Sequence, residues 1–380
     1  MSLGKTIMLF GLGDLGGWVL EFLARQHGIS KIITCDPRAD YGELKSASVQ
    51  GGAGHMGFPV TIKFEKTDVF DIDRTAELIM KYNPDFIYAS MTQLSWWVPS
   101  LLPHEVHEEI LKAAGPLVPT HVTLVSKLMK AVKKTGLKMP VLNNSWPDLT
   151  NPILTRNGLG PTVGAGNLDL IVAEIRRKVS LAENVPIPEI DVYFFAEHVL
   201  NMRDVKLGIP YYCKIMIDDK DITNKFDVDE MINGVFYRKC PPSVQTSWLI
   251  QNVVASTTVR IITGILNDTG ELSHAPGPNG LIGGYPIRLR ASGVEVVLPE
   301  GLTLEEAQKI NIEDCKFEGV EEMKADGTLV FTEEGRKVMK DFFGMNQTEL
   351  RFEDMEERAK EILAAYKKLA EKYKAPTYFY

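Results

Sequence analysis

Short apolar runs alternate with segments of helical periodicity along the first part of the chain. Residues 5–10 form such a run and end at Gly11, which is typical of a strand buried on both faces of a parallel sheet. Apolar residues then recur at helical spacing over 16–26, and residues 29–35 predict the second strand. Further strands are predicted over 60–64, 86–90 and 140–144, with helices over 73–82 and 122–134. This alternation predicts a doubly wound, parallel Rossmann sheet, which we assign to a first domain over residues 1–150.

Strict alternation ends beyond residue 150, where the pattern predicts a second, α+β domain over residues 151–380. Its predicted elements are helices over 167–180 and 245–266, a strand over 190–195, a β-hairpin over 287–298, and a charged amphipathic C-terminal helix over 353–374. We expect the C-terminal helix to pack against the protein or against a second subunit. Residues 91–119 of the first domain predict a long loop with one helix, and loops of this length are usually functional or mobile.

Composition places the chain among ordinary globular proteins, with 44% hydrophobic and 24% charged residues in a length of 380. Its formal net charge of −8 argues against a broad basic surface, so we expect no nucleic acid partner. No apolar leader and no uncharged apolar stretch of bilayer length is found, so we expect no membrane association. The cysteines form no CxxC pair, which fits a cytoplasmic protein without a cysteine metal site; they are Cys35, Cys213, Cys240 and Cys315.

A GxGxxG motif, Gly11-Leu12-Gly13-Asp14-Leu15-Gly16, lies between the first predicted strand and the first predicted helix. In this context the motif is typical of dinucleotide binding, because its glycines permit a tight turn and a close approach of the pyrophosphate to a helix N-terminus. The second strand ends in Asp36, whose carboxylate is placed to accept hydrogen bonds from the adenosine ribose and would repel a 2′-phosphate. NAD is therefore favoured over NADP, although Arg38 keeps NADP open. The predicted cofactor-binding residues are Gly11, Gly13, Asp14, Leu15, Gly16, Asp36, Arg38, Ser90, Met91 and Asn144.

Several later segments resemble, in the same order, those of the lactate/malate dehydrogenase superfamily. Residues 143–150 are similar to its Ser-Asn-Pro-Val-Asp segment, residues 163–169 to its Gly-x-x-Leu-Asp helix start, and Ala196-Glu197-His198 to its Gly-Glu-His-Gly. The resemblance implies a divergent member of that superfamily, in which a Rossmann domain precedes an α+β domain. It also implies a homodimer or homotetramer.

The chemistry implied by the resemblance is NAD-dependent transfer of a hydride between the nicotinamide and a secondary alcohol or ketone. His198 would be the base that takes the hydroxyl proton. Asp169 would hydrogen-bond the imidazole of His198, orient it and stabilise its charged form. These two residues are the predicted catalytic pair.

The chain departs from the family pattern at the groups that bind the substrate carboxylate. Val172 stands where the family has an arginine, and residues 91–104 contain no arginine. A valine cannot supply the two-pronged hydrogen bond of a guanidinium, so the substrate is predicted to differ from simple lactate or malate. The substitutes that we consider for substrate binding are Asn144, Ser145, Arg203, Thr246, Trp96 and Trp97.

Two alternatives remain open beside this atypical dehydrogenase. One is a catalytically inactive NAD-binding regulatory or structural homologue, suggested by the loss of both arginine sites. The other resembles the NAD-dependent glycoside hydrolases, which hold a metal with Cys and His. Ser145 in place of a cysteine disfavours that alternative, and bound manganese would revive it.

Overall fold

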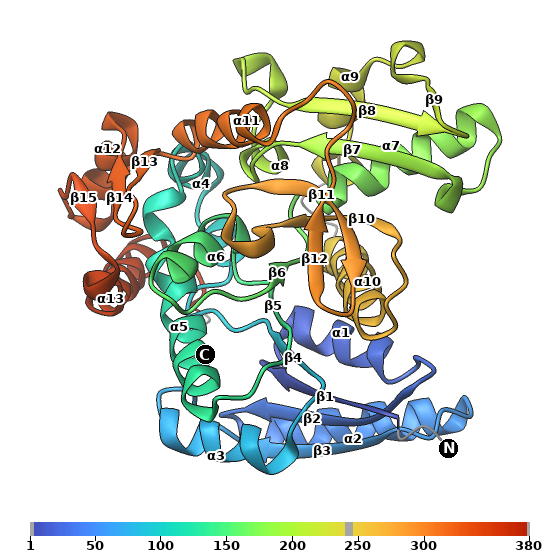
Figure 1. The fold of residues 1–380 in the computed structure, drawn as a ribbon. Coiled ribbons are helices and arrows are strands. Elements are labelled where there is room, and N and C mark those ends of the chain that lie inside the picture. The colour runs from blue at the N-terminus through green and yellow to red at the C-terminus, as the bar shows by residue number, and fades with distance from the viewer. Residues whose placement is uncertain (1–3, 240–245, 378–380) are drawn as a thin grey trace.

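The computed structural model describes residues 4–239 and 246–377 of the chain. Its largest sheet has the strand order β3-β2-β1-β4-β5-β6, and all of its strand pairs are parallel (Figure 1). The strands are β1 (Lys5–Phe10), β2 (Ile29–Asp36), β3 (Thr61–Lys66), β4 (Phe86–Ala89), β5 (Val141–Asn143) and β6 (Val163–Gly164). This is the strand order of a doubly wound dinucleotide-binding sheet, so the predicted fold class is confirmed.

Helices cover both faces of this sheet, because successive residues of a strand point to opposite sides. Ile7 and Leu9 of β1 belong to the apolar core shared with α1, α2 and α10, whereas Met8 and Phe10 belong to the core shared with α3, α5 and α6. The helices are α1 (Asp14–Leu23), α2 (Ala39–His55), α3 (Ile72–Tyr82), α5 (Pro119–Thr135), α6 (Pro147–Arg156) and α10 (Thr246–Leu266). Both faces are therefore buried, as the continuous apolar runs predicted.

Helix α2 is absent from the pattern-based prediction. Its sequence carries several glycines and lacks an apolar stripe, and the pattern therefore has no helical period. Packing requires a glycine at position 42, because a Cβ at Gly42 would lie 2.0 Å from the ring of Phe64. Tertiary packing overrides local propensity in this helix.

The middle of the chain forms two three-stranded sheets, β7-β8-β9 and β10-β11-β12. Their strands are β7 (Ile190–Phe195), β8 (Tyr212–Ile217), β9 (Lys220–Asp221), β10 (Leu272–Pro276), β11 (Gly284–Arg290) and β12 (Gly293–Val296). The helices that accompany them are α7 (Asp169–Glu183), α8 (Val199–Met202) and α9 (Val228–Asn233). The predicted strand over 190–195 and the predicted hairpin are both confirmed, and α7 and α10 occupy the predicted helices.

The division into two domains at residue 150 stays a prediction. The first sheet extends past that residue to include β6, and α10 packs against α1 across the predicted boundary. By length and apolarity alone, Leu249–Leu266 of α10 would be long enough to cross a membrane. More than half of that stretch is buried inside the molecule, and a core helix of a globular protein passes the same test.

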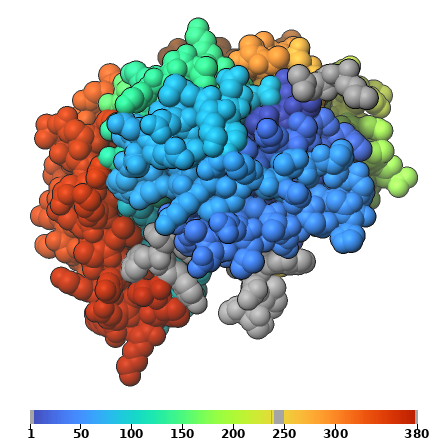
Figure 2. Space-filling model, turned by 90° about the horizontal axis from the view of Figure 1, so that it is seen from below, coloured from blue at the N-terminus to red at the C-terminus, as the bar shows by residue number. Residues whose placement is uncertain are grey.

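The C-terminal segment continues through α11 (Leu304–Phe317), β13 (Val320–Met323), β14 (Leu329–Phe331), α12 (Glu333–Phe343), β15 (Glu349–Leu350) and α13 (Met355–Tyr373). Helix α11 begins with a capping box, in which Thr303 and Glu306 satisfy each other's backbone amides. From β13 onward the segment lies beside α5 and α4 (His104–Leu111), the helix that was predicted within the long loop (Figure 1). Figure 2 shows it as a continuous mass against the first part of the chain.

The long loop is packed down by this C-terminal segment. Leu94, Val98 and Leu102 of the loop share an apolar core with Ile362 and Tyr366 of α13. The hydroxyl of Tyr366 donates a hydrogen bond of 2.8 Å to the carbonyl of Val98. The C-terminal helix therefore packs against its own chain, at the loop that borders the candidate site.

Candidate active site

A cleft of about 380 Å³ opens at the carboxyl ends of β1, β2 and β4. All ten residues predicted to bind the cofactor line it, together with Trp96, Trp97 and Ser145 from the predicted substrate set. In an open α/β sheet this edge, where the strand order reverses, is the usual place of a bound ligand. Residues predicted from separate strands thus converge on one cleft.

The glycine loop has the geometry that a pyrophosphate requires. Gly11 has φ of +96°, a left-handed conformation that glycine adopts without strain. A Cβ at Gly16 would lie 1.9 Å from the carbonyl oxygen of Gly11, so only glycine permits this contact between helix and strand. A Cβ at Gly13 would meet no atom within 4 Å, which leaves open space at the N-terminus of α1. The described residues therefore fit a dinucleotide.

Asp36 lies at the end of β2 with its carboxylate held in place. One oxygen accepts from the amide of Leu12 at 2.9 Å, and the other accepts from the amide of Arg38 at 3.0 Å. The Arg38 guanidinium also binds both carboxylate oxygens, at 2.8 and 3.0 Å. Burial acts to raise the pKa of Asp36, but these hydrogen bonds outweigh it and hold the pKa below its usual value. Asp36 is therefore an ionised acceptor at the adenosine end of the cleft.

Asp14, a predicted cofactor-binding residue, places a carboxyl group beside the glycine loop. It lines the cleft, and burial raises its pKa, while a hydrogen bond with Gln251 and the charge of Lys45 act in the opposite direction.

The end of the cleft lined by His121 and Ser145, here called the closed end, carries hydrogen-bonded polar side chains. His121 Nδ1 lies 3.0 Å from the Ser145 hydroxyl and 3.3 Å from that of Thr92. Burial, and then the positive charge of His198, lower the pKa of His121 to about 3, so its imidazole is neutral. His121 is buried in the wall of the cleft. Its place on the wall, beside Ser145, could not be found from the sequence because no motif marks it.

The predicted loss of the usual carboxylate clamp stays a prediction, and the lining of the cleft agrees with it. Among the described residues that line the cleft, the only arginine is Arg38, which lies at the adenosine end. Arg203, proposed from sequence as an anion-binding group, is not in the lining. Its guanidinium donates to the backbone carbonyls of Lys112 and Phe317 at 3.0 and 2.9 Å, so that expectation is corrected to a structural role at two helix ends.

Two other predicted substrate contacts have different positions. Asn144 lines the cleft, but its amide donates to the carbonyl of Ala165 at 2.8 Å, and its oxygen accepts from Thr258 at 3.3 Å. These bonds fix the residue after β5 against the residue after β6 and against α10. The side chain of Thr246 lies outside the described part of the chain.

The predicted pairing of Asp169 with His198 is wrong, because the carboxylate of Asp169 is fully engaged elsewhere. One oxygen binds Nδ1 of His274 at 2.8 Å, and the other accepts from the Thr257 hydroxyl at 2.8 Å and the Gly166 amide at 3.1 Å. Nε2 of His274 lies 3.0 Å from the carbonyl of Phe194, which can only accept. Both ring nitrogens of His274 therefore face oxygen atoms, and the imidazole and the carboxylate form a buried hydrogen-bonded pair.

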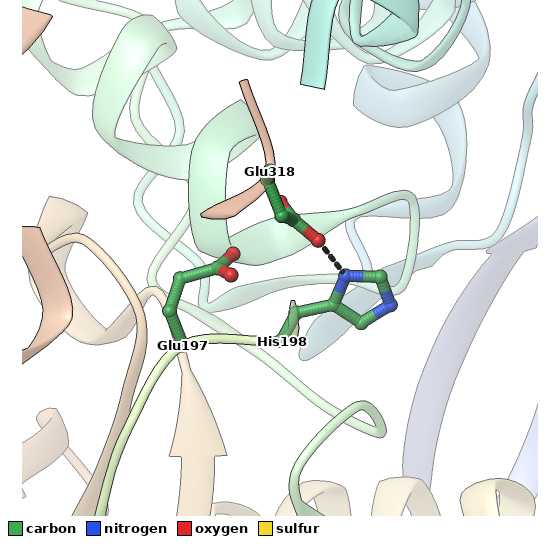
Figure 3. Close-up of side chains that lie close together, drawn as sticks. All are labelled: Glu197, His198 and Glu318. Carbon is green, nitrogen blue, oxygen red and sulfur yellow. Dashed lines mark hydrogen bonds and ion pairs between the residues drawn. The ribbon is translucent and has the colours of Figure 1, made fainter. Parts of the chain in front are cut away.

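His198 has a different carboxylate partner, Glu318, which sequence reasoning missed. Its Nδ1 lies 2.6 Å from Oε1 of Glu318, as Figure 3 shows. Burial acts to lower the pKa of His198, but the charge and hydrogen bond of Glu318 outweigh it, and the pKa is raised. His198 does not line the cleft; the ring of Trp146 contacts both His121 and His198, at centroid distances of 5.2 and 5.5 Å, and lies between them.

Four buried carboxylic acids surround this histidine. Glu197 and Glu318 are joined by Asp148 from α6 and Asp314 from α11. Burial raises the pKa of Asp148 to about 6 and that of Asp314 to about 9. Burial, followed by the negative charges of Glu318 and Asp148, raises the pKa of Glu197 well above its usual value. Too little positive charge therefore lies near these four carboxyl groups to keep all of them ionised.

Comparison with known proteins places the fold. No protein-family model and no curated protein matches the chain. Among solved structures, a malate dehydrogenase from Cryptosporidium parvum matches with a TM-score of 0.59 at 14% identity, over 83% of this chain and 97% of that one. A lactate dehydrogenase from a Medee basin deep-sea metagenome library matches with a TM-score of 0.58 at 13% identity, over 83% and 96%. A lactate dehydrogenase from Eimeria maxima, solved with NADH and oxamate, matches with a TM-score of 0.56 at 15% identity, over 82% and 90%.

The chain therefore has the fold of the lactate and malate dehydrogenases. The resemblance predicted from its motifs is confirmed at this level, and the low identity makes it a divergent example of that fold. A dehydrogenase-like fold also agrees with the glycine loop, the strand order and the position of the cleft.

Proposed function

We propose that the protein is a nicotinamide-dinucleotide-dependent oxidoreductase that prefers NAD(H), a divergent relative of the lactate and malate dehydrogenases. This proposal rests on one observation: the glycine loop and Asp36 line the same cleft. Gly13 leaves room for the pyrophosphate at the N-terminus of α1, and Asp36 presents an ionised carboxylate where the adenosine ribose would bind. The dinucleotide, when bound, would accept or supply a hydride.

The substrate that suits the closed end is an alcohol or ketone without a carboxylate. Trp96 and Trp97 provide apolar surface there, while Ser145 and His121 provide hydrogen bonds. Without an arginine or lysine among the described residues at this end, a carboxylate would lose its hydration and gain no cation in return. Ser145 and His121 would orient the reacting oxygen through hydrogen bonds, because they line the cleft and His198 does not.

A non-catalytic dinucleotide-binding protein is the second candidate. The observation that favours it is the absence of the Asp169–His198 pair, since Asp169 is engaged with His274. An absorbance screen at 340 nm over alcohols, ketones and 2-hydroxy acids separates the two candidates. Turnover of an uncharged alcohol or ketone supports the oxidoreductase; NADH binding without turnover of any member supports the second candidate. The alternative of a glycoside hydrolase-like enzyme gains no support from Ser145, whose hydroxyl binds His121.

Cofactor preference provides the direct test of the proposal. We expect NADH to bind at least about 10-fold more tightly than NADPH, and the Asp36→Ser variant to remove most of this difference, because the repulsion of a 2′-phosphate is lost while Arg38 remains. Energy transfer from the tryptophans of the cleft to the reduced nicotinamide measures both affinities. The preference should persist at pH 5, because the lowered pKa of Asp36 keeps it ionised there.

The control for this test is Asp68→Ser. Asp68 also lines the cleft, but its carboxylate accepts no hydrogen bond from the Leu12 amide. It should leave the ratio of the two affinities unchanged. Equal binding of NADH and NADPH by the unmodified protein would contradict the preference for NAD. Failure to bind either would contradict the proposed function itself.

The pH profile of alcohol oxidation distinguishes the two candidate histidines. His121 has a pKa lowered to about 3, so it is neutral at every pH above about 4 and its capacity to accept a proton does not change between pH 5 and 8. We therefore expect kcat/KM to stay within about 3-fold over that range, and to fall at least about 10-fold in His121→Gln. If His198 were the base, its raised pKa would make kcat/KM fall as the pH drops below that value. A steep loss of rate toward pH 5, with activity retained in His121→Gln, would contradict the role of His121.

A further inference from the structure

Three side chains from two distant parts of the chain converge beneath the closed end of the cleft. Glu197 and His198 follow β7, and Glu318 follows α11. One ligand atom from each lies within 4.8 Å of the others, and Figure 3 shows both carboxylates and the imidazole facing a common point. Two donors bound to one ion at about 2.0–2.4 Å cannot be farther apart than about this distance. The three groups therefore have the spacing of a metal centre.

Two buried oxygens of this group have no partner in the described part of the chain. They are Oε1 of Glu197, in a residue with 0% exposure, and Oε2 of Glu318, in a residue with 3% exposure. The other oxygen of Glu197 accepts from the amide of Val199 at 2.8 Å, which holds the carboxylate in place, and Figure 3 shows this carboxylate directed toward Glu318. A buried carboxylate oxygen without a donor is costly, so the orientation of these two indicates a missing cation.

No lysine or arginine among the described residues supplies a cation to these oxygens. Among the described residues, no lysine or arginine forms an ion pair with Glu197, Glu318, Asp148 or Asp314; His198 is the one basic group that does. The guanidinium of Arg203 is directed to the carbonyls of Lys112 and Phe317. Asp148 and Asp314 also keep one buried oxygen each without a hydrogen-bond partner.

We propose that Glu197, His198 and Glu318 bind one divalent transition-metal ion of the Mn²⁺, Fe²⁺ or Zn²⁺ class. An imidazole nitrogen with two carboxylates selects these ions over Ca²⁺ and Mg²⁺, which prefer all-oxygen sites. The ion takes the place of the proton now shared between His198 Nδ1 and Glu318 at 2.6 Å. It lies behind Trp146, whose ring contacts His198 on one side and His121 of the cleft wall on the other. This site does not depend on the proposed function.

The test is a titration of the EDTA-treated, dialysed full-length protein with MnCl₂, in which electron paramagnetic resonance measures the free ion. We expect one Mn²⁺ per chain, displaced by Zn²⁺, and a rise of several degrees in Tm on saturation. Glu197→Gln and Glu318→Gln should each weaken binding at least about 10-fold, because each removes a charged donor. The matched control is Glu313→Gln on α11, an exposed carboxylate paired with Lys316, which should bind as the unmodified protein does.

A second measurement uses the unmodified protein, so it does not depend on whether a variant folds. In the unmodified protein, bound Mn²⁺ should broaden the imidazole signals of His198 in the nuclear magnetic resonance spectrum at substoichiometric ion, while those of the exposed His104 stay sharp. Absence of stoichiometric binding with Mn²⁺, Fe²⁺ and Zn²⁺ would overturn the proposal and leave a cluster of protonated carboxylic acids. Binding that both glutamine variants retain, or that leaves His198 unbroadened, would also overturn it.

Discussion

The Asp169→Ala variant should lower the free energy of unfolding by about 3–5 kcal/mol, because it leaves the buried imidazole of His274 without its carboxylate partner. The side chains of His274 and Asp169 are only 2% and 5% exposed, so water cannot replace the lost partner. Thr257 and the Gly166 amide would each lose an acceptor in addition. Urea unfolding followed by circular dichroism measures the change.

The control for this prediction is Asp73→Ala, which breaks the exposed pair of Asp73 with Lys134 and should cost less than about 1 kcal/mol. A double-mutant cycle with His274→Leu isolates the pair, and its coupling energy should reach about 2 kcal/mol. A loss below about 1 kcal/mol in Asp169→Ala would contradict the stabilising role of this pair. The same variant also separates a structural role of Asp169 from a catalytic one. If Asp169 supported the catalytic base, its loss would abolish turnover and leave the free energy of unfolding nearly unchanged.

Gly13→Val should weaken NADH binding at least about 100-fold and leave the free energy of unfolding within about 1 kcal/mol. The added Cβ would meet no protein atom within 4 Å, and Gly13 has an extended backbone, with φ −64° and ψ −161°, that valine accepts. The side chain would instead fill the space proposed for the pyrophosphate. Tryptophan-to-nicotinamide energy transfer measures binding, and urea unfolding measures stability.

Gly51→Val is the size-matched control for this variant. Gly51 lies on α2, and a Cβ there also meets nothing within 4 Å, but the position is outside the cleft lining. NADH binding should therefore be unchanged. Gly16 would be an ambiguous choice, because its added Cβ would strike the Gly11 carbonyl and disturb the fold itself. Unimpaired NADH binding by Gly13→Val would contradict the position assigned to the pyrophosphate.

Much of the fold and of the cleft could be predicted because the signals are local. Apolar runs that end at Gly11 and Asp36 mark strands and also place the residues that follow them at one edge of the sheet. Helix α2 escaped prediction because its glycines erase the helical period. Helix α11 escaped although Thr303 and Glu306 have the spacing of a capping box, a signal that could have located its start.

The pairing of catalytic groups could not be predicted because it depends on contacts between distant segments. Asp169 meets His274 across 105 positions, and His198 meets Glu318 across 120. Nothing near Asp169 in sequence indicates that β10 supplies a second histidine. The family motif predicted that Asp169 and His198 pair with each other, but packing gives each of them a different partner.

The contact between α13 and the loop after β4 has a thermodynamic consequence for ligand binding. A segment that must become ordered around each ligand subtracts its conformational entropy from the affinity. Here that entropy is already lost when the chain folds, because Tyr366 and Ile362 hold Val98 and its neighbours in place. The wall that carries Trp96 and Trp97 is thus preorganised. Such a rigid wall selects ligands by shape.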